Sequence, residues 1–216
     1  MRTLFRACLI ALLIATLIEA PGFAAPSRVL GVVLQAERAR LSSGDAITGA
    51  TVFDGDTFST EASGALRLRV GAAQLYLLAS SAGSMRQSAG GVSATLERGS
   101  LIYSAAPGEG FELRAAEAVI RPRAGQQTLA QITLTAAHEL VVTSQHGQLE
   151  VTVYNETHVV PEATTYRVEI EPEIPNPQGG PPVRPGRSRF IILALALIAI
   201  GTGIGLWRAL ISPSSI

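Results

Sequence analysis

The sequence predicts an all-β protein: an antiparallel β-sandwich or jelly-roll-like domain of short strands, followed by one C-terminal transmembrane helix. Short runs in which apolar and polar residues alternate recur about every eight to twelve residues, with Gly and Pro between them. No stretch between the two ends of the chain has sustained helical periodicity. Both ends are apolar, and the C-terminal apolar run is long enough for a membrane helix.

Composition excludes several classes of function. The chain has 216 residues, which is enough for one ordinary domain together with targeting segments. Its formal net charge is +0, so it lacks the basic excess of proteins that bind nucleic acid. Every basic residue is Arg, and Lys is absent. Cys8 is the single cysteine, which excludes an internal disulfide and argues against thiol chemistry.

Residues 1–24 have the layout of a secretory signal peptide. A basic start is followed by an apolar run over 7–18, and Gly22 and Ala24 supply the small residues before an expected cleavage after Ala24. The alternative is an uncleaved anchor helix, but the run is short for a membrane span, which needs about twenty residues. Cleavage would remove Cys8 and leave a mature protein without cysteine.

Residues 190–211 are predicted to form the transmembrane helix, and only the short tail 212–216 follows. The run carries one charge, Arg208 near its end, whose long side chain can reach the membrane interface. Gly201 and Gly205 have the small-xxx-small spacing that lets two helices pack closely. A lipid-facing span that merely tolerates glycine explains them as well, so helix pairing stays an open alternative.

The two apolar segments predict a single-pass protein of the inner (cytoplasmic) membrane, with its β domain in the periplasm or extracellular space. Arg184, Arg187 and Arg189 precede the predicted helix on the side that this topology places outside. That position opposes the positive-inside tendency. A leading signal peptide normally sets the orientation first, and we therefore expect this topology.

The first half of the domain contains a predicted hairpin over residues 52–78. Leu66, Leu68 and Val70 alternate with arginines before a break at Gly71, and side chains in a strand alternate between its two faces. A loop is expected over the Ser-, Ala- and Gly-rich residues after this hairpin, and Gly99 is expected to turn the chain between two strands. The expected strands are 28–34, 66–70, 74–78, 92–96 and 100–104, and the expected loop is 79–91. The polar residues 37–43 could pair at an edge, and residues 47–53 lead into the hairpin.

The second half continues the series and ends in a linker. Its expected strands are 111–115, 118–121, 131–135, 139–143, 149–154, 158–160 and 165–170. Residues 172–189 are dominated by Pro, Gly and Arg, which describes an extended linker without the apolar content to fold. The globular domain is therefore expected over residues 26–171.

The sequence contains no motif typical of an enzyme, and we expect no catalytic activity. Nucleophilic hydrolysis needs a serine, a base and an orienting acid, but there is no G-x-S-x-G motif, and serines such as Ser80, Ser81 and Ser84 lie in small-residue segments. His138, His146 and His158 have spacings that match no helical or hairpin ligand pair. A metal site or a hydrolase site would require these histidines to converge in space. We expect scattered surface or turn histidines instead.

Two groups of charged residues have competing interpretations. Asp54 and Asp56 flank Gly55 and could contribute to a calcium loop, but the other oxygen ligands are missing and turn formation explains them better. Arg67 and Arg69, joined by Arg114, could form a basic stripe, although a solvated outer face is the simpler expectation.

A glycosylation triplet is present at 155–157. We expect no catalytic, cofactor-binding or metal-binding residues.

The order of turns and strands identifies a family resemblance. The segments that carry it are G-D-T-F-S-T at 55–60, G-A-L-R-L-R-V-G at 64–71, Q-L-Y-L at 74–77, L-E-R-G-S-L at 96–101 and F-E-L at 111–113. In this order they resemble the FecR-like domain, a periplasmic module named for the ferric-citrate regulator. The resemblance extends over residues 29–153. It implies an all-β extracytoplasmic domain, most often bacterial, that works by protein contact.

The chain departs from the plan of the regulator that names this family. In that regulator, a cytoplasmic segment ahead of the membrane helix contacts a sigma factor. Here a predicted signal peptide comes first and the predicted helix is C-terminal, so we do not expect direct sigma-factor control. We expect a non-catalytic, membrane-anchored module that contacts an envelope protein and senses a signal. The alternative is a carbohydrate-binding β-sandwich, which would need exposed aromatic side chains on one face.

Overall fold

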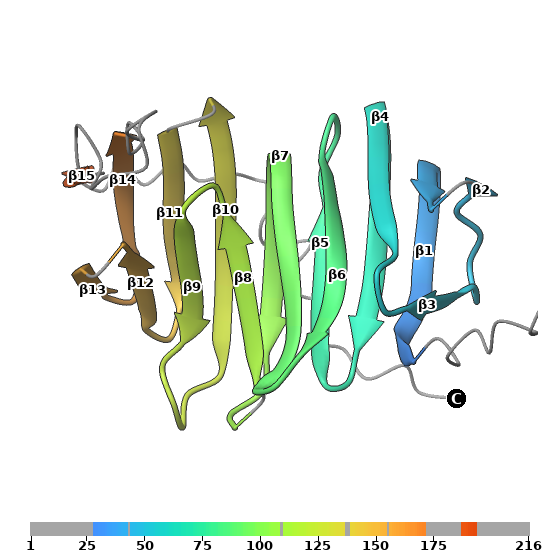
Figure 1. Ribbon diagram of the computed structural model, residues 1–216, viewed down its shortest axis with the longest axis horizontal. Coiled ribbons are helices and arrows are strands. Elements are labelled where there is room, and N and C mark those ends of the chain that lie inside the picture. The colour runs from blue at the N-terminus through green and yellow to red at the C-terminus, as the bar shows by residue number, and fades with distance from the viewer. Residues whose placement is uncertain are drawn as a thin grey trace, which may run out of the picture.

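The computed structural model describes residues 28–42, 44–108, 110–136, 139–154, 156–171 and 187–193. The described residues form fifteen strands joined by turns, which confirms the all-β prediction (Figure 1). Among them there is no helix of the length and apolar character that a membrane crossing requires. The predicted signal peptide and residues 194–216 lie outside the described residues, as do Gly201 and Gly205.

The fifteen strands vary widely in length. They are β1 (Val29–Leu41), β2 (Gly44–Asp45), β3 (Thr51–Phe53), β4 (Thr57–Val70), β5 (Ala73–Leu77), β6 (Ala82–Ser88), β7 (Gly91–Ala105), β8 (Phe111–Ala115), β9 (Ala118–Pro122), β10 (Thr128–Ala136), β11 (Glu139–His146), β12 (Leu149–Val153), β13 (Glu156–Val160), β14 (Thr164–Glu171) and β15 (Arg187–Leu193).

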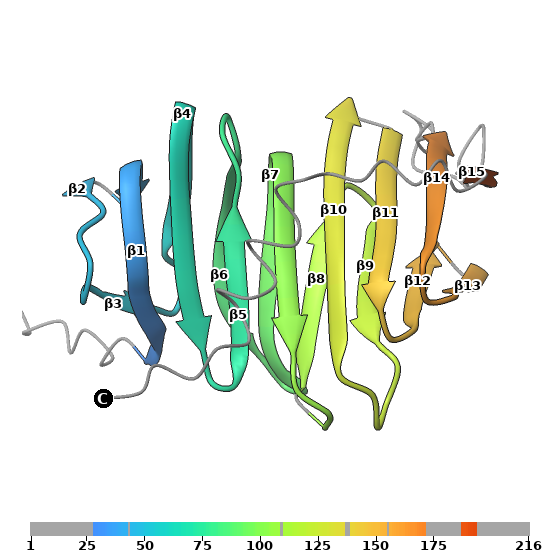
Figure 2. The ribbon, with the colours of Figure 1, turned by 180° about the vertical axis from the view of Figure 1, so that it is seen from behind.

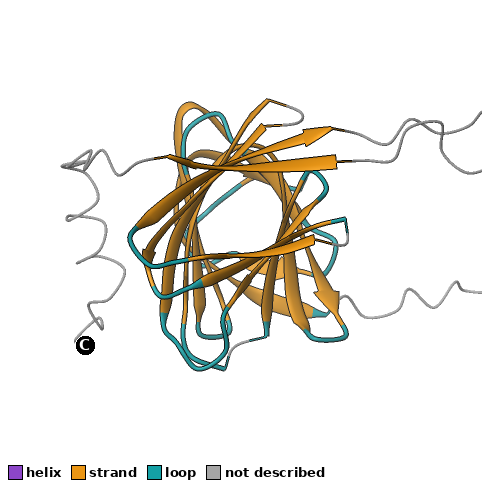
Figure 3. Cartoon of the chain, turned by 90° about the vertical axis from the view of Figure 1, so that its left-hand side faces the viewer, coloured by secondary structure: helices purple, strands orange, loops and turns teal. Residues whose placement is uncertain are grey.

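Long strands join two layers of one continuous sheet. The first half of β7 pairs with β6 and β8, and its second half pairs with β5 and β10. From β7, the front layer continues through β8, β9, β12 and β13, and the back layer continues through β10, β11, β14 and β15. Figures 1 and 2 show the two layers from opposite sides, and Figure 3 shows the strands encircling a common interior.

The core lies between the two layers. Leu113 and Ile120 of the front layer and Ile132 and Val142 of the back layer are all fully buried. They belong to a single cluster of buried side chains that extends from β1 to β14. Since inward and outward side chains alternate along each strand, the polar residues between these positions lie on the outer faces.

A polar network holds the place where the chain passes from one layer to the other. The hydroxyl of Thr60 on β4 donates to the carbonyl of Leu78 at 2.5 Å and accepts from the amide of Ser81 at 2.9 Å. The hydroxyl of Ser81 donates to the Ser100 carbonyl at 3.0 Å and accepts from the Ser100 amide at 2.9 Å. The side chains of Thr60 and Ser81 thus form hydrogen bonds with backbone groups that the strands cannot pair where they bend.

Several predicted elements differ from the structure. Residues 92–96 and 100–104 belong to one strand, β7, because the chain bends at Gly99 (φ 85°) without losing its strand pairing. The predicted loop 79–91 contains β6. The small residues of β6 allow close packing, since a Cβ at Gly83 would lie 2.2 Å from the carbonyl oxygen of Thr95. β7 and β8 pair in parallel, whereas the sequence predicts antiparallel pairs throughout.

Strand β15 closes one end of the domain together with β13. The rings of His158 on β13 and Phe190 on β15 have centroids 3.9 Å apart, and the Ser188 hydroxyl lies 3.3 Å from the carboxylate of Glu156. β15 spans residues that the sequence divides between the linker and the start of the predicted transmembrane helix. The rest of both predicted segments lies outside the described residues.

Candidate functional site

The acidic turn that the sequence singles out serves the backbone. Asp56 accepts hydrogen bonds from the Ser42 hydroxyl at 2.6 Å and from the Phe53 amide at 2.7 Å. Asp54 accepts one from the amide of Gln87 on β6 at 2.9 Å. Both carboxylates therefore fix the entry to β4 against its neighbours, as the turn interpretation predicts.

The two described histidines have different contacts. His146 contacts Glu162, with 2.9 Å between Nδ1 and Oε1, at the end of β11, whereas His158 stacks on Phe190. His138 lies outside the described residues. Across the described ranges, no three His, Cys, Asp or Glu side chains converge as a metal site would require.

The suggested basic stripe is divided between the two layers. Arg67 and Arg69 lie on the back-layer part of β4, which pairs with β5, and the guanidinium of Arg67 donates to the side chain of Gln74 at 2.7 Å. Arg114 lies on β8 in the front layer. Ser81 is buried in the layer-crossing network, and Ser84 pairs with Thr95 in the β6–β7 ladder, so both serines have structural roles.

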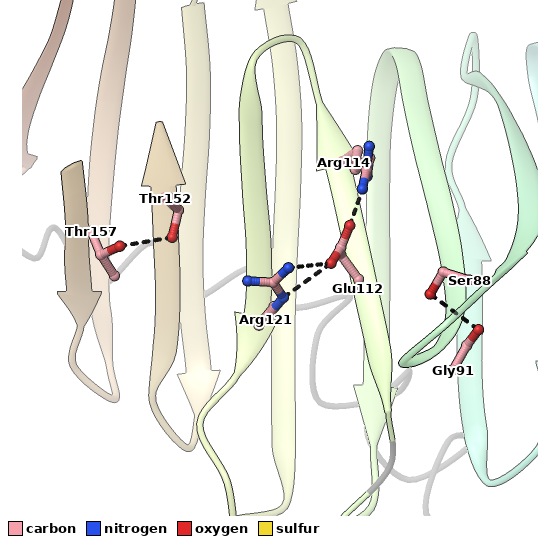
Figure 4. Close-up of polar contacts among 7 residues, drawn as sticks. All are labelled: Ser88, Gly91, Glu112, Arg114, Arg121, Thr152 and Thr157. Carbon is pink, nitrogen blue, oxygen red and sulfur yellow. Dashed lines mark hydrogen bonds and ion pairs between the residues drawn. The ribbon is translucent and has the colours of Figure 1, made fainter. Parts of the chain in front are cut away.

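The front layer presents a charged cluster that the sequence analysis missed. Glu112 on β8 lies between two arginines (Figure 4). Its Oε1 accepts from Arg114 Nε at 2.7 Å, and its Oε2 accepts from Arg121 Nε at 3.0 Å and from Arg121 Nη2 at 2.5 Å. The Glu112 side chain is only 13% exposed, whereas each arginine side chain is 55% exposed. We call these three residues the arginine pair site.

The local sequence explains why the three side chains meet. In β8, Phe111, Leu113 and Ala115 point into the core, so Glu112 and Arg114 point outward. A tight turn then brings β9 back antiparallel, with Leu113 opposite Ile120. Glu112 precedes Leu113 and Arg121 follows Ile120, so the same register places Arg121 opposite Glu112. The spacing of Glu112 and Arg121 in the sequence is therefore that of an opposite-charge pair across a hairpin.

The two arginines set the ionisation of Glu112. Partial burial by itself would raise the pKa of this carboxyl, but hydrogen bonds and charge attraction from Arg114 and Arg121 outweigh burial and lower the pKa below its usual value of 4.5. Glu112 is therefore an anion at neutral pH. It holds both guanidinium groups in place, and the site carries one net positive charge.

A shallow cavity of about 420 Å³ adjoins the arginine pair site. Its lining combines the site's three side chains with small residues from the β6–β7 turn and from the start of β8. The lining residues are Ser88, Ala89, Gly90, Gly110, Phe111, Glu112, Arg114, Arg121 and Pro122. Gly90 faces open space, because a Cβ added there would have no atom within 4 Å. The cavity is thus an open depression with backbone along one side and guanidinium groups along the other.

The outward side chains beside the cavity are mostly polar, and none of the described residues in the two rows that they form is aromatic. Two rows of outward residues cross the front layer side by side, as the pairing register shows. Charges alternate in the first row, and hydroxyl groups dominate the second, where the hydroxyls of Thr152 and Thr157 are 2.9 Å apart (Figure 4). The first row is Arg86, Ser93, Glu112, Arg121, Glu150 and Val159; the second is Ser84, Thr95, Arg114, Val119, Thr152 and Thr157.

The tyrosines are packed rather than presented to solvent. Tyr103 is fully buried, and the other three are half-buried. On the back layer, Tyr76 packs beside Leu78 against Ile102 and Leu129. This arrangement does not favour the carbohydrate-binding alternative, which needs aromatic rings exposed together on one face.

Replacement of Glu112 by Gln provides a test of the charge balance in the arginine pair site. We expect Glu112→Gln to lower the free energy of unfolding by about 1 kcal/mol at neutral pH, because three charge-assisted hydrogen bonds weaken at a partly exposed position. A lowered pKa in the folded state contributes stability above pH 4.5 that is lost as the pH falls through the lowered value. The difference from wild type should therefore shrink in acid.

Urea unfolding of both proteins, followed by circular dichroism from pH 7 down to about pH 3, measures this difference. Glu150→Gln is the matched control, since Glu150 lies on the same face on β12. A difference between Glu112→Gln and wild type that stays constant with pH would contradict the described charge balance.

Comparisons with known proteins give only a distant structural likeness. No protein-family model matches the chain, and no curated protein matches it. One similar solved structure is a protein from Parabacteroides distasonis that carries the provisional description of anti-sigma factor. The two share 12% sequence identity with a TM-score of 0.45, and the match covers 62% of this chain and 58% of that chain. The match thus spans less than two thirds of that protein's length.

Proposed function

We propose that this chain is a non-catalytic binding module of the bacterial envelope that contacts a protein partner through the front layer. The observation that carries the proposal is the arginine pair site. It is a charged cluster held in fixed geometry beside an open depression on an exposed sheet face. Held side chains lose little entropy on binding, which favours recognition. Among the described residues, the serine, histidine and aspartate side chains considered for catalysis or metal binding make structural contacts and do not converge on one site.

The sequence supplies the setting of this proposed function. The predicted signal peptide and the apolar run after β15 support an inner-membrane protein whose β domain faces the periplasm or extracellular space. Residues 194–211 carry a single charge, at Arg208, and their number lies within the roughly 17–25 residues of a membrane span. The FecR-like order of turns supports a role in sensing a signal through protein contact.

Site-directed photo-crosslinking in membranes of the producing organism tests the proposed function. The chain has no Lys and only Cys8, so a Cys8→Ser background allows one thiol to be placed at will. Thr95→Cys puts a thiol-attached photo-crosslinker beside Arg114 on the front layer. Gln131→Cys puts it on the outer face of the back layer, at an equally half-buried strand position.

We expect a discrete crosslinked protein from position 95 and none from position 131, with the partner identified by mass spectrometry. Equal crosslinking from both positions would indicate nonspecific contact and contradict the proposal. A complete lack of envelope partners at position 95 would contradict it as well.

A further inference from the structure

We infer that the arginine pair site binds a carboxylate side chain of an acidic polypeptide segment; this inference rests on the proposed function and specifies the chemistry of the partner. Its first support is unused donor capacity. Arg114 uses only Nε toward Glu112, and Arg121 uses Nε and Nη2. Within the described part of the chain, the other guanidinium nitrogens of these two residues donate no hydrogen bond.

The charge and planarity of the site select the kind of anion. Guanidinium groups bind carboxylates in a flat, two-point geometry, and here two of them flank one depression. Glu112 leaves a single net positive charge, which a carboxylate neutralises. A dianionic phosphate group would reverse the net charge of the site and leave a negative charge beside Glu112, so the site fits a monoanion better.

The lining of the depression favours a polypeptide over an acidic glycan. Gly90 leaves one side open to close approach by an extended backbone, and the adjoining row offers a hydroxyl group at half-buried Thr95. Sugar rings are usually held by aromatic faces, but Phe111 is 4% exposed and presents no face to a ligand. A polypeptide rich in Glu or Asp supplies the carboxylate and requires no aromatic platform.

The test measures binding of fluorescent poly-L-glutamate to the full chain in lipid nanodiscs, by anisotropy at low and physiological salt. Poly-L-glutamine is the uncharged comparison, and polygalacturonate is the acidic-glycan comparison. Arg121→Gln removes part of the arginine pair site. Arg123→Gln is the matched control, because Arg123 lies two residues away and its guanidinium donates to Gln148 at 2.6 Å, outside the lining of the depression.

We expect poly-L-glutamate to bind and poly-L-glutamine not to bind. Arg121→Gln should weaken binding about tenfold, and Arg123→Gln should leave it unchanged. Equal loss in both variants would overturn the inference, since it would indicate nonspecific charge attraction. Tighter binding of polygalacturonate, with the same dependence on Arg121, would overturn the polypeptide assignment. If no acidic polymer binds while position 95 still crosslinks, the acidic-partner inference fails and the proposed function stands.

Discussion

Gly99→Ala is expected to destabilise the domain more than replacement of a glycine in a turn. At Gly99 the backbone has φ 85°, and a Cβ would lie 2.4 Å from the Ser81 hydroxyl oxygen and 2.6 Å from the Ser81 Cα. An L-residue in this conformation costs about 1–2 kcal/mol, and forcing atoms into packed structure adds about 1–3 kcal/mol. Ser81 cannot move away easily, because its hydroxyl holds Ser100 in the layer-crossing network.

Gly55→Ala is the matched control for this prediction. Gly55 has nearly the same backbone angle, φ 88°, but a Cβ there has no atom within 4 Å. Its replacement should therefore cost only the conformational part, about 1–2 kcal/mol. Urea unfolding of the two variants gives the comparison directly. Equal losses of stability would mean that Gly99 is required for its backbone angle alone, which would contradict the close approach at the layer crossing.

Replacements of Tyr103 are expected to have opposite effects on stability. Tyr103 is fully buried, its ring centroid lies 5.5 Å from that of Phe111, and its hydroxyl has no hydrogen-bond partner among the described residues. Tyr103→Ala should cost about 3–5 kcal/mol through loss of packing. Tyr103→Phe keeps the ring and removes a buried hydroxyl without a partner, so stability should stay the same or rise by about 1 kcal/mol.

Alkaline pH separates the hydroxyl's contribution from that of the ring. Burial raises the pKa of Tyr103 above its ordinary value of 10.0, so the folded protein retains the phenol proton while the unfolded chain releases it. Stability linked to this group is fully present below pH 10.0 and is lost as the pH rises above it. The advantage of Tyr103→Phe over wild type should therefore grow above pH 10.0 in thermal unfolding. A lower stability of Tyr103→Phe at neutral pH would show that the hydroxyl has a partner.

Much of the fold was predictable because period-two alternation identifies strands with one buried face. The hairpin over residues 66–77 and the later strands on β8, β9 and β12 follow that pattern. β6 was missed because its close contacts require Gly83 and small neighbours, a composition that also describes a loop. Gly99 was correctly identified as a break in direction, but local sequence does not tell whether strand pairing continues through such a bend.

The candidate site was less predictable than the fold for a different reason. Catalytic and metal-binding residue types stand out in the sequence, but Asp54, Asp56 and the described histidines make other contacts in the structure. The arginine pair site depends on a cross-strand register that brings Arg121 beside Glu112. A two-residue turn between β8 and β9 fixes that register, so the pairing of opposite charges was predictable once both strands had been assigned.

The proposed role of the arginine pair site is to mediate the contact with a partner. Its most direct test is the yield of the crosslink from position 95, compared between Arg121→Gln and Arg123→Gln proteins present at equal levels in the membrane. We predict that Arg121→Gln abolishes most of the crosslink and that Arg123→Gln preserves it. An undiminished crosslink in Arg121→Gln would show that the partner contacts the front layer without using this site, and would contradict the claim.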